Sequence, residues 1–316
     1  MIEIDDLEVD VSEMCNLACT HCSHVSPHYT NKDDKYTLSE FADDIAILAK
    51  YLKVNVFRVL GGEPLLNRDL VGFLKVINES KIANKISLFT NGTLLDIGDS
   101  FLTYIDELRV SIYPSKGVSP HQIISTLRLI KDKHPHIHIA ANSVKYFSKM
   151  HLIEKHSDAA IISKIYNDCF HAKHGKSIFK GRLYRCFTTR KKLKLFDVYK
   201  GMLKDEPDIN VSTDALTITE KITPERLSAF LSNPAPLDTC KWCLGCSGKY
   251  FKHSENETIN DYATLDDLDF DQGKSYISNC LYNWYTGHPD DLISEPCFDA
   301  SKLAEHGIHH DEPVTI

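Results

Sequence analysis

Three cysteines lie within eight residues near the start of the chain. The spacing C-x3-C-x2-C allows Cys15, Cys19 and Cys22 to surround one small inorganic centre. A zinc ion would need a fourth ligand to complete its tetrahedron. A 4Fe–4S cluster usually takes four thiolates, so three would leave one iron open to an external ligand. The candidates for a fourth zinc ligand are the histidines nearby in the sequence: His21, His24 and His28.

A second motif, Gly61-Gly62-Glu63-Pro64, follows a β-rich run over residues 54–60. Two adjacent glycines let a ligand approach the backbone without obstruction by a side chain. The carboxylate of Glu63 beside such a gap could hold an ammonium group, and Pro64 fixes the exit from the turn. Taken alone, the motif is more often an ordinary turn. Its position matters, because the ends of successive parallel strands converge on one face of a βα barrel.

The first half of the chain alternates between predicted strands and predicted helices. Each unit takes about 25–30 residues, which favours parallel βα units. The predicted strands cover residues 7–13, 54–60, 85–89, 107–113 and 136–140. The predicted helices cover 68–79, 119–132 and the apolar series Phe41, Ile45, Leu48, Ala49 and Leu52 that follows a capping box at Thr37-Leu38-Ser39-Glu40. Beyond about residue 150 the alternation ends. We expect a hairpin around the central Gly-Lys-Ser of residues 166–200, a helix over 224–231 and an acidic surface segment over 253–273.

The two motifs together resemble those of the radical S-adenosylmethionine (AdoMet) superfamily, over roughly residues 7–145. The resemblance implies an α/β fold, with a partial (β/α)6 TIM-like radical SAM barrel that holds a cluster at its top. It implies that Cys15, Cys19 and Cys22 bind three irons of a 4Fe–4S cluster. The open iron of this cluster would bind the amino and carboxylate groups of AdoMet.

The resemblance also implies residues that contact AdoMet. Gly61, Gly62, Glu63 and Pro64 correspond to the family segment that meets its ammonium group. Asn91, within Thr90-Asn91-Gly92, resembles a turn common in the family, and Ser111 resembles a polar residue that often meets the ribose. For Asn91 and Ser111 a purely structural role, as a turn former and a polar residue at a strand end, fits as well. His21 stands where the family usually has an aromatic residue.

A second set of cysteines lies in the other half of the chain. Cys169 and Cys186 enclose Gly181 in the pattern C-x11-G-x4-C, and C-x2-C-x2-C follows at residues 240–246. Read alone, the later triplet is typical of an iron–sulfur ligand run, and a zinc knuckle is the alternative. With the hairpin, the set resembles the auxiliary-cluster domains called SPASM and, in their shorter form, twitch.

The spacing departs from the full SPASM pattern, because two residues stand where five are expected before Cys246. This departure favours the twitch form with one auxiliary 4Fe–4S cluster. The resemblance then implies four ligands: Cys169, Cys186, Cys240 and Cys243. Cys246 is either a replacement ligand or a free thiol that could return a hydrogen atom to a substrate. We expect Cys280 and Cys297 to be buried small hydrophobes.

Composition excludes several classes of protein. The chain has 316 residues, 42% of them apolar, and a formal charge of −8, which argues against nucleic acid as a partner. The acidic N-terminus is no signal peptide, and no apolar run approaches the roughly 18 residues of a membrane span. We therefore expect a cytoplasmic protein, in which ten reduced cysteines indicate metal or redox chemistry. The basic run at 190–194 could meet a phosphate or carboxylate, but we expect a solvated face.

We expect two domains, a radical SAM core over residues 1–155 and an α+β twitch/SPASM-like domain with a C-terminal extension over 156–316. The expected function is reductive cleavage of AdoMet to a 5′-deoxyadenosyl radical, followed by oxidation or epimerisation of a small polar, sugar-like substrate. Only 14 residues precede Cys15, so we expect no N-terminal leader-binding domain. Modification of a ribosomal peptide is the alternative, and a metal-stabilised binding or electron-transfer module is the non-enzyme alternative. The expected partner is an electron donor such as flavodoxin or ferredoxin.

Overall fold

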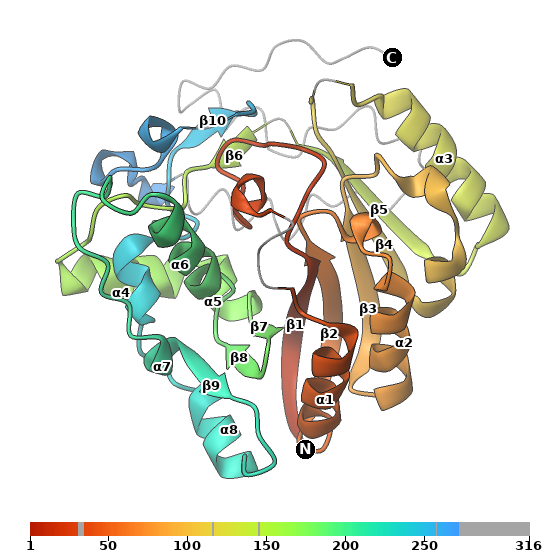
Figure 1. Cartoon of the computed structure of the whole chain (residues 1–316), viewed down its shortest axis with the longest axis horizontal. Coiled ribbons are helices and arrows are strands. Elements are labelled where there is room, and N and C mark those ends of the chain that lie inside the picture. The colour runs from red at the N-terminus through yellow and green to blue at the C-terminus, as the bar shows by residue number, and fades with distance from the viewer. Residues whose placement is uncertain (31–34, 116, 145, 257, 272–316) are drawn as a thin grey trace.

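A computed structural model of the chain describes residues 1–271, apart from 31–34, 116, 145 and 257. An eight-stranded sheet runs through these residues in the order β5-β4-β3-β2-β1-β7-β8-β9 (Figure 1). Neighbouring strands from β5 to β7 are parallel, whereas β8 is antiparallel to both of its neighbours. The mostly parallel α/β fold expected from the sequence is therefore confirmed.

The elements follow one another along the chain with few long connections. The strands are β1 (Ile2–Ser12), β2 (Leu52–Gly61), β3 (Ala83–Thr90), β4 (Glu107–Ile112), β5 (His138–Ser143), β6 (Tyr146–Ser148), β7 (Ser177–Phe179), β8 (Arg182–Tyr184), β9 (Ala215–Thr217) and β10 (Tyr250–Lys252). The helices are α1 (Leu38–Leu48), α2 (Leu70–Ser80), α3 (Pro120–Lys133), α4 (Ala159–Asp168), α5 (Phe170–His174), α6 (Thr188–Val198), α7 (Val211–Asp214) and α8 (Pro224–Leu231). Strands β6 and β10 form a separate antiparallel pair.

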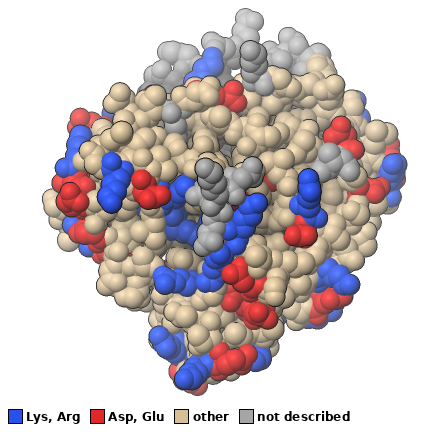
Figure 2. Space-filling view, in the orientation of Figure 1, with Lys and Arg blue, Asp and Glu red and all other residues tan. Residues whose placement is uncertain are grey.

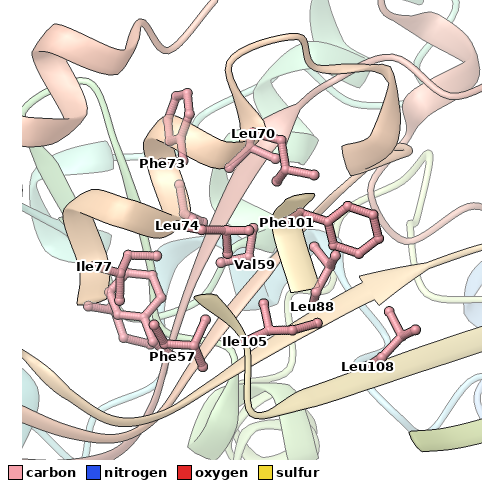
Figure 3. Packing of buried hydrophobic residues seen from close by; sticks show 14 of the residues in the cluster. Phe57, Val59, Leu70, Phe73, Leu74, Ile77, Leu88, Phe101, Ile105 and Leu108 are labelled. Carbon is pink, nitrogen blue, oxygen red and sulfur yellow. The ribbon is translucent and has the colours of Figure 1, made fainter. Parts of the chain in front are cut away.

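Apolar side chains from α1, α2 and α3 pack against one face of the parallel strands and form the main core. Figure 3 shows part of it, where Phe73 and Leu74 project from α2 and Leu74 lies beside Val59 of β2. All three are almost completely buried. Burial of such side chains supplies most of the free energy that holds the helices on the sheet.

The first strand is buried on both of its faces, but the two faces differ in chemistry. Leu7 and Val9 are fully buried in the apolar core. Because side chains alternate along a strand, Asp6, Glu8 and Asp10 point to the opposite face, where they are also buried. The sheet therefore encloses a polar interior on the side away from the helices.

The capping box predicted before the first helix is confirmed. Thr37 accepts a hydrogen bond from the Glu40 backbone, and the Glu40 carboxylate accepts one from the Thr37 backbone at 2.9 Å. The predicted extension of this helix to Leu52 is wrong, since α1 ends at Leu48 and Leu52 begins β2. The Tyr51 carbonyl accepts a hydrogen bond from the backbone of Ile2, so sheet pairing takes over directly after the helix.

A hairpin does form within residues 166–200, but its turn lies at Lys180-Gly181 and not at the Gly-Lys-Ser of residues 175–177. Both turn residues have a positive φ, which glycine tolerates best. Strand β7 of this hairpin pairs in parallel with β1, from Glu8 opposite Ser177 onward. The main sheet thus continues across the predicted boundary at residue 155, and the division into two domains stays a prediction.

Charged residues of both signs are interspersed over the face of the molecule shown in Figure 2. In the part of the chain that the structure describes, none of the helices is both long and apolar enough to cross a bilayer. The region over 253–273 is described up to residue 271, and Tyr262 and Ala263 within it are buried, so this segment is not purely surface as expected. Cys280 and Cys297 lie outside the described residues.

Candidate functional site

The first three cysteines stand on a loop of residues 13–25, the cysteine loop, which follows directly after β1. Residues 254–256 hold this loop from the other side. The Thr20 backbone donates to the Ser254 carbonyl at 2.8 Å, and the Asn256 backbone donates to the Ala18 carbonyl at 3.0 Å. Cys19 forms an isolated bridge with Glu255 between these two bonds. Sequence reasoning missed this partner, because the two segments are far apart in the chain.

Gly61 and Gly62 are packed against the backbone at the start of the cysteine loop. A Cβ atom on Gly61 would lie 2.1 Å from the Ser12 carbonyl oxygen, and one on Gly62 would lie 2.3 Å from that of Met14. The Gly62 backbone donates to Ser12 at 2.7 Å and the Glu63 backbone donates to Met14 at 2.9 Å. The two glycines are needed for this close contact between two backbones, in addition to any role toward a ligand.

Glu63 is fully buried, and its carboxylate is occupied by the neighbouring turn. It accepts hydrogen bonds from the Leu65 backbone at 3.0 Å, the Thr90 hydroxyl at 2.7 Å and the Asn91 backbone at 2.8 Å. Burial raises the pKa of Glu63, and these three donors oppose the rise. The side chain therefore fixes the Thr90-Asn91-Gly92 turn relative to the GGEP segment, while Pro64 begins a short 3-10 helix over Pro64–Leu66.

Asn91 extends this network to the first cysteine. Its Nδ2 atom lies 2.8 Å from Oδ1 of Asn16 and 3.6 Å from Sγ of Cys15. Its Oδ1 atom accepts from the Thr93 backbone at 3.0 Å. The Leu17 backbone also donates to Cys15 Sγ, at 3.4 Å. Donors of this kind favour a thiolate and are typical of sulfur atoms that bind iron.

A cavity of about 450 Å³ lies next to these motifs, within the size range of small-molecule sites. Seven of the predicted site residues line it: Cys15, Cys19, Cys22, Gly61, Gly62, Asn91 and Ser111. Glu63 and Pro64 are not among its lining residues, which agrees with the inward bonds of the Glu63 carboxylate. The three thiols fit an iron–sulfur cluster. The two glycines beside them leave room for a ligand that contacts backbone groups.

Among the described residues, no group of three His, Cys, Asp or Glu side chains is placed to hold a single metal ion. His21 and His24, both named as candidate zinc ligands, also line the cavity. The ring of His21 contacts Phe251 edge-on at 4.3 Å between centroids, and that of His24 stacks on Phe187 at 4.7 Å. His28 does not line the cavity, and its Nε2 atom lies 2.6 Å from the Tyr262 hydroxyl.

The polar interior of the sheet supplies further cavity residues that sequence reasoning missed. Glu8 of β1, Arg58 of β2 and Arg109 of β4 all line the cavity. Arg58 is paired with Asp6 at 2.7 Å. The only signal in the sequence is the acidic residue at every second position of the first strand, and that pattern is also typical of a solvated face.

Glu107, the first residue of β4, is almost fully buried and gathers several polar partners. Arg109 donates to it through Nε at 2.9 Å and Nη2 at 3.2 Å, and the Ser87 hydroxyl donates at 2.6 Å. His138 Nδ1 lies 3.0 Å away and Lys85 Nζ 3.2 Å away. Burial alone would raise the pKa of Glu107, but these partners lower it to about 2.

The basic run at 190–194 is not the solvated face predicted for it, because its first three residues are buried. Arg190 contacts the carboxylates of Asp10 and Glu13. Lys191 Nζ lies 2.7 Å from Asp10 and 2.6 Å from Glu13. Burial favours a raised pKa for Asp10, but Lys191, His24 and Arg190 together hold it well below its usual range. The run does meet carboxylates, and they belong to the protein itself.

The second set of cysteines surrounds a smaller cavity of about 20 Å³. All four predicted auxiliary ligands line it: Cys169, Cys186, Cys240 and Cys243. Burial, together with the charges of neighbouring thiols, raises the pKa of Cys186, Cys240 and Cys243. The eight cysteines that the structure describes are all free thiols. Four clustered thiols are the kind of donor set that an iron–sulfur cluster takes. Burial lowers the pKa of the nearby Lys192 to about 7, and the charge of Cys243 opposes this change.

Cys246 does not line either of these two cavities. Its Sγ lies 3.9 Å from that of Cys169 and it is buried. The intervening Gly245 has a positive φ, and a Cβ atom on it would lie 3.0 Å from Cys169 Sγ. Cys246 is therefore close enough to the second set to be a ligand, but it does not face the larger cavity as a hydrogen donor to a substrate there would.

The two cavities share part of their walls. Met150 and His171 line both of them. Burial, followed by the charges of His24 and Arg58, lowers the pKa of His171 to about 3, so the shared wall carries no charge near neutral pH. The two sets of thiols, separated by about 150 residues in the sequence, are thus brought to neighbouring sites.

The fold and the two sites define an α/β protein with three clustered cysteines where parallel strands end. Residues 9–136 match the family model "Radical SAM superfamily", and this part of the chain is a radical SAM domain. A domain of this family implies a 4Fe–4S cluster and AdoMet. The resemblance stated from the cysteine and GGEP motifs is confirmed.

The curated relatives that match this chain carry one recurrent name. GTP 3′,8-cyclase of Staphylococcus carnosus is 28% identical over 176 residues, covering 41% of this chain and 52% of that protein. A probable GTP 3′,8-cyclase of Methanocaldococcus jannaschii is 36% identical over 94 residues, covering 30% of each. The chain thus spans about half or less of the length of these relatives. Among solved structures, BtrN in complex with AdoMet and 2-DOIA is similar with a TM-score of 0.47 and 16% identity, covering 83% of this chain and 98% of that one.

Proposed function

We propose that the chain is a radical SAM enzyme that oxidises or epimerises a small polar, sugar-like substrate. The wall shared by the two cavities, at Met150 and His171, is the observation that supports this most. A substrate in the larger cavity would lie between the first three thiols and the second set. An iron–sulfur group bound by the second set could then exchange an electron with it, as an oxidation requires.

In this proposal Cys15, Cys19 and Cys22 hold the AdoMet-binding cluster, and a second cluster is held by Cys169, Cys186, Cys240 and Cys243. When they are bound, the first cluster and AdoMet provide the chemistry that removes a hydrogen atom from an unactivated carbon.

The chain's own residues orient and enclose the reacting groups. Gly61 and Gly62 expose backbone groups to AdoMet, and Asn91 and Ser111 line the same cavity. Glu63 fixes the turn that carries Asn91. Aromatic side chains on the cavity wall, among them Phe147 and Phe187, exclude water from a reactive intermediate. A flavodoxin or ferredoxin is the class of electron donor that this chemistry needs.

Cyclisation of a purine nucleotide is a second candidate, favoured by the names of the relatives. A triphosphate would need several unpaired cations. The two arginines that line the cavity, Arg58 and Arg109, are each already paired with a carboxylate, Asp6 and Glu107. This pairing favours a less charged substrate. Modification of a ribosomal peptide is the alternative. A peptide would need a larger and more open cavity than a small sugar-like substrate does.

Anaerobic reconstitution tests the proposal. We expect about eight iron atoms per chain for two cubane clusters, and formation of 5′-deoxyadenosine from AdoMet on reduction. Cys186→Ala should retain about four iron atoms and AdoMet cleavage but lose oxidation of substrate. Cys15→Ala should lose the four iron atoms that Cys186→Ala retains, and with them all AdoMet cleavage. Zinc without iron, or intact AdoMet, would contradict the proposal and favour a metal-stabilised binding module.

A further inference from the structure

Glu8 is a buried carboxyl group in the wall of the larger cavity, with only 5% of the residue exposed. Its Oε1 atom has no hydrogen-bond partner in the described part of the chain. A buried polar atom without a partner is destabilising, so such atoms are few in native structures. Because Glu8 also lines the cavity, a ligand bound there would give its carboxyl group a partner.

The groups around Glu8 determine which partner it fits. Asp10 lies two residues further along β1, Arg58 stands opposite on β2, and Arg190 and Lys191 approach from α6. Burial, and then the charge of Asp10, raise the pKa of Glu8 to about 8, against the opposing effect of the three cations. The carboxyl group is therefore mostly protonated at neutral pH and can donate a hydrogen bond.

The charges nearest to Glu8 are already balanced. Arg58 is paired with Asp6, and the cations of α6 are paired with Asp10 and Glu13. Flat ring surfaces lie on the same cavity wall, where His24 stacks on Phe187 with their planes 7° apart. A neutral donor beside paired charges and ring faces fits a ring that carries hydroxyl groups better than it fits a multiply charged ligand.

We propose that Glu8 is a substrate-binding residue that donates a hydrogen bond to a hydroxyl or carbonyl oxygen of a hydroxylated ring. The inference rests on the proposed function, since it names the group that holds the substrate beside the site of hydrogen abstraction. It assigns Glu8 a role in binding and not in proton removal.

Two substitutions separate these roles. Glu8→Gln keeps a neutral donor of the same shape, whereas Glu8→Ala removes it. The probes are carbon-deuterated myo-inositol and glucose, and the measurement is transfer of deuterium to 5′-deoxyadenosine in the reconstituted enzyme. We expect the wild type and Glu8→Gln to have similar KM values. Glu8→Ala should raise KM by about ten- to a hundredfold while kcat changes less. The matched control is Asp5→Asn, an exposed acidic residue on the same strand.

An infrared titration tests Glu8 without substrate or cluster turnover. The wild type should show the carbonyl band of a buried protonated carboxyl group that disappears with a midpoint of about 8. Glu8→Gln should lack this band, and Asp5→Asn should retain it. Iron content and AdoMet binding of all variants show whether each is folded and loaded.

The outcomes distinguish this inference from the proposed function. Absence of 5′-deoxyadenosine in the wild type overturns the proposed function, and the infrared band then still decides the state of Glu8. Cleavage of AdoMet without transfer from either probe overturns the substrate class. If Glu8→Gln is as impaired as Glu8→Ala, the group acts as a base and the donor role is wrong. Absence of the infrared band also overturns it.

Discussion

At the scale of single residues, the site depends on how closely two pieces of backbone approach. Gly62 permits the Met14–Cys15 peptide to lie against the GGEP segment, and Glu63 ties the same segment to Asn91. Asn91 in turn contacts Cys15. The position of the first thiol therefore depends on residues that are not themselves predicted cluster ligands.

Gly62→Ala tests this dependence. Its Cβ would lie 2.3 Å from the Met14 oxygen and 2.9 Å from the Cys15 nitrogen, and backbone atoms cannot turn aside as a side chain can. We expect the reconstituted variant to lose about four of its eight iron atoms, with AdoMet cleavage reduced at least tenfold. Gly72→Ala is the matched control, because its Cβ meets only the end of the Leu38 side chain. Full iron in Gly62→Ala would contradict the prediction.

At the scale of elements, neighbouring strands share one row of polar and ionisable side chains. Strand register places Glu8 opposite Arg58, Arg58 opposite Ser87 and Ser87 opposite Glu107. Arg58 of β2 is paired with Asp6 on the neighbouring strand β1. Glu107 is paired with Arg109 on the same strand, β4. The parallel sheet thus stabilises charges that would be costly to bury singly.

The pH dependence of stability should reflect Glu107. A carboxyl group whose folded-state pKa is lowered from 4.5 to about 2 contributes stability above its unfolded pKa and loses it as the pH falls toward 2. Glu107→Gln should therefore cost about 3 kcal/mol at neutral pH. The difference from the wild type should shrink steadily below about pH 4.5. Urea unfolding at several pH values measures it.

The exposed Glu220, which pairs with Lys50 at the surface, supplies the comparison. Glu220→Gln should change the free energy of unfolding by less than about 1 kcal/mol at every pH. A cost of Glu107→Gln that is independent of pH would assign its effect to lost packing and not to charge.

At the scale of the whole molecule, α6 joins the segment that carries Cys186 to the strand that precedes Cys15. Lys191 is fully buried between Asp10 of β1 and Glu13 of the cysteine loop. Two cations therefore face two carboxylates where the halves of the chain meet. This contact, together with the pairing of β7 with β1, keeps the two sets of thiols at neighbouring cavities.

Lys191→Met should be strongly destabilising, because it keeps the volume of the side chain but leaves buried carboxylate charge uncompensated. We expect a loss of about 3–5 kcal/mol in the free energy of unfolding. Lys200→Met, at an exposed position just beyond α6, should have an effect below about 0.5 kcal/mol. Thermal or urea unfolding measures both variants, and equal stability of the two would show that the buried contact contributes nothing.

The sequence by itself determined the parallel βα architecture and the capping box at Thr37, and it predicted the first cysteine site. Short-range patterns in the sequence indicate these features: periodic apolar residues, a helix cap, and three thiols within eight residues. Through a resemblance to a known pattern, the sequence also predicted that four cysteines of the second set lie close together. Local spacing carries such information because neighbours in sequence must also be neighbours in space.

Only the tertiary structure decided the roles of the charged residues. Glu8 and Lys191 look like surface residues in the sequence, and the prediction of a solvated face for the basic run was wrong. Their burial depends on pairing between strands and helices more than 100 residues apart. A buried charge is costly unless an opposite charge pairs with it, and the sequence does not show which distant residue the fold brings to it.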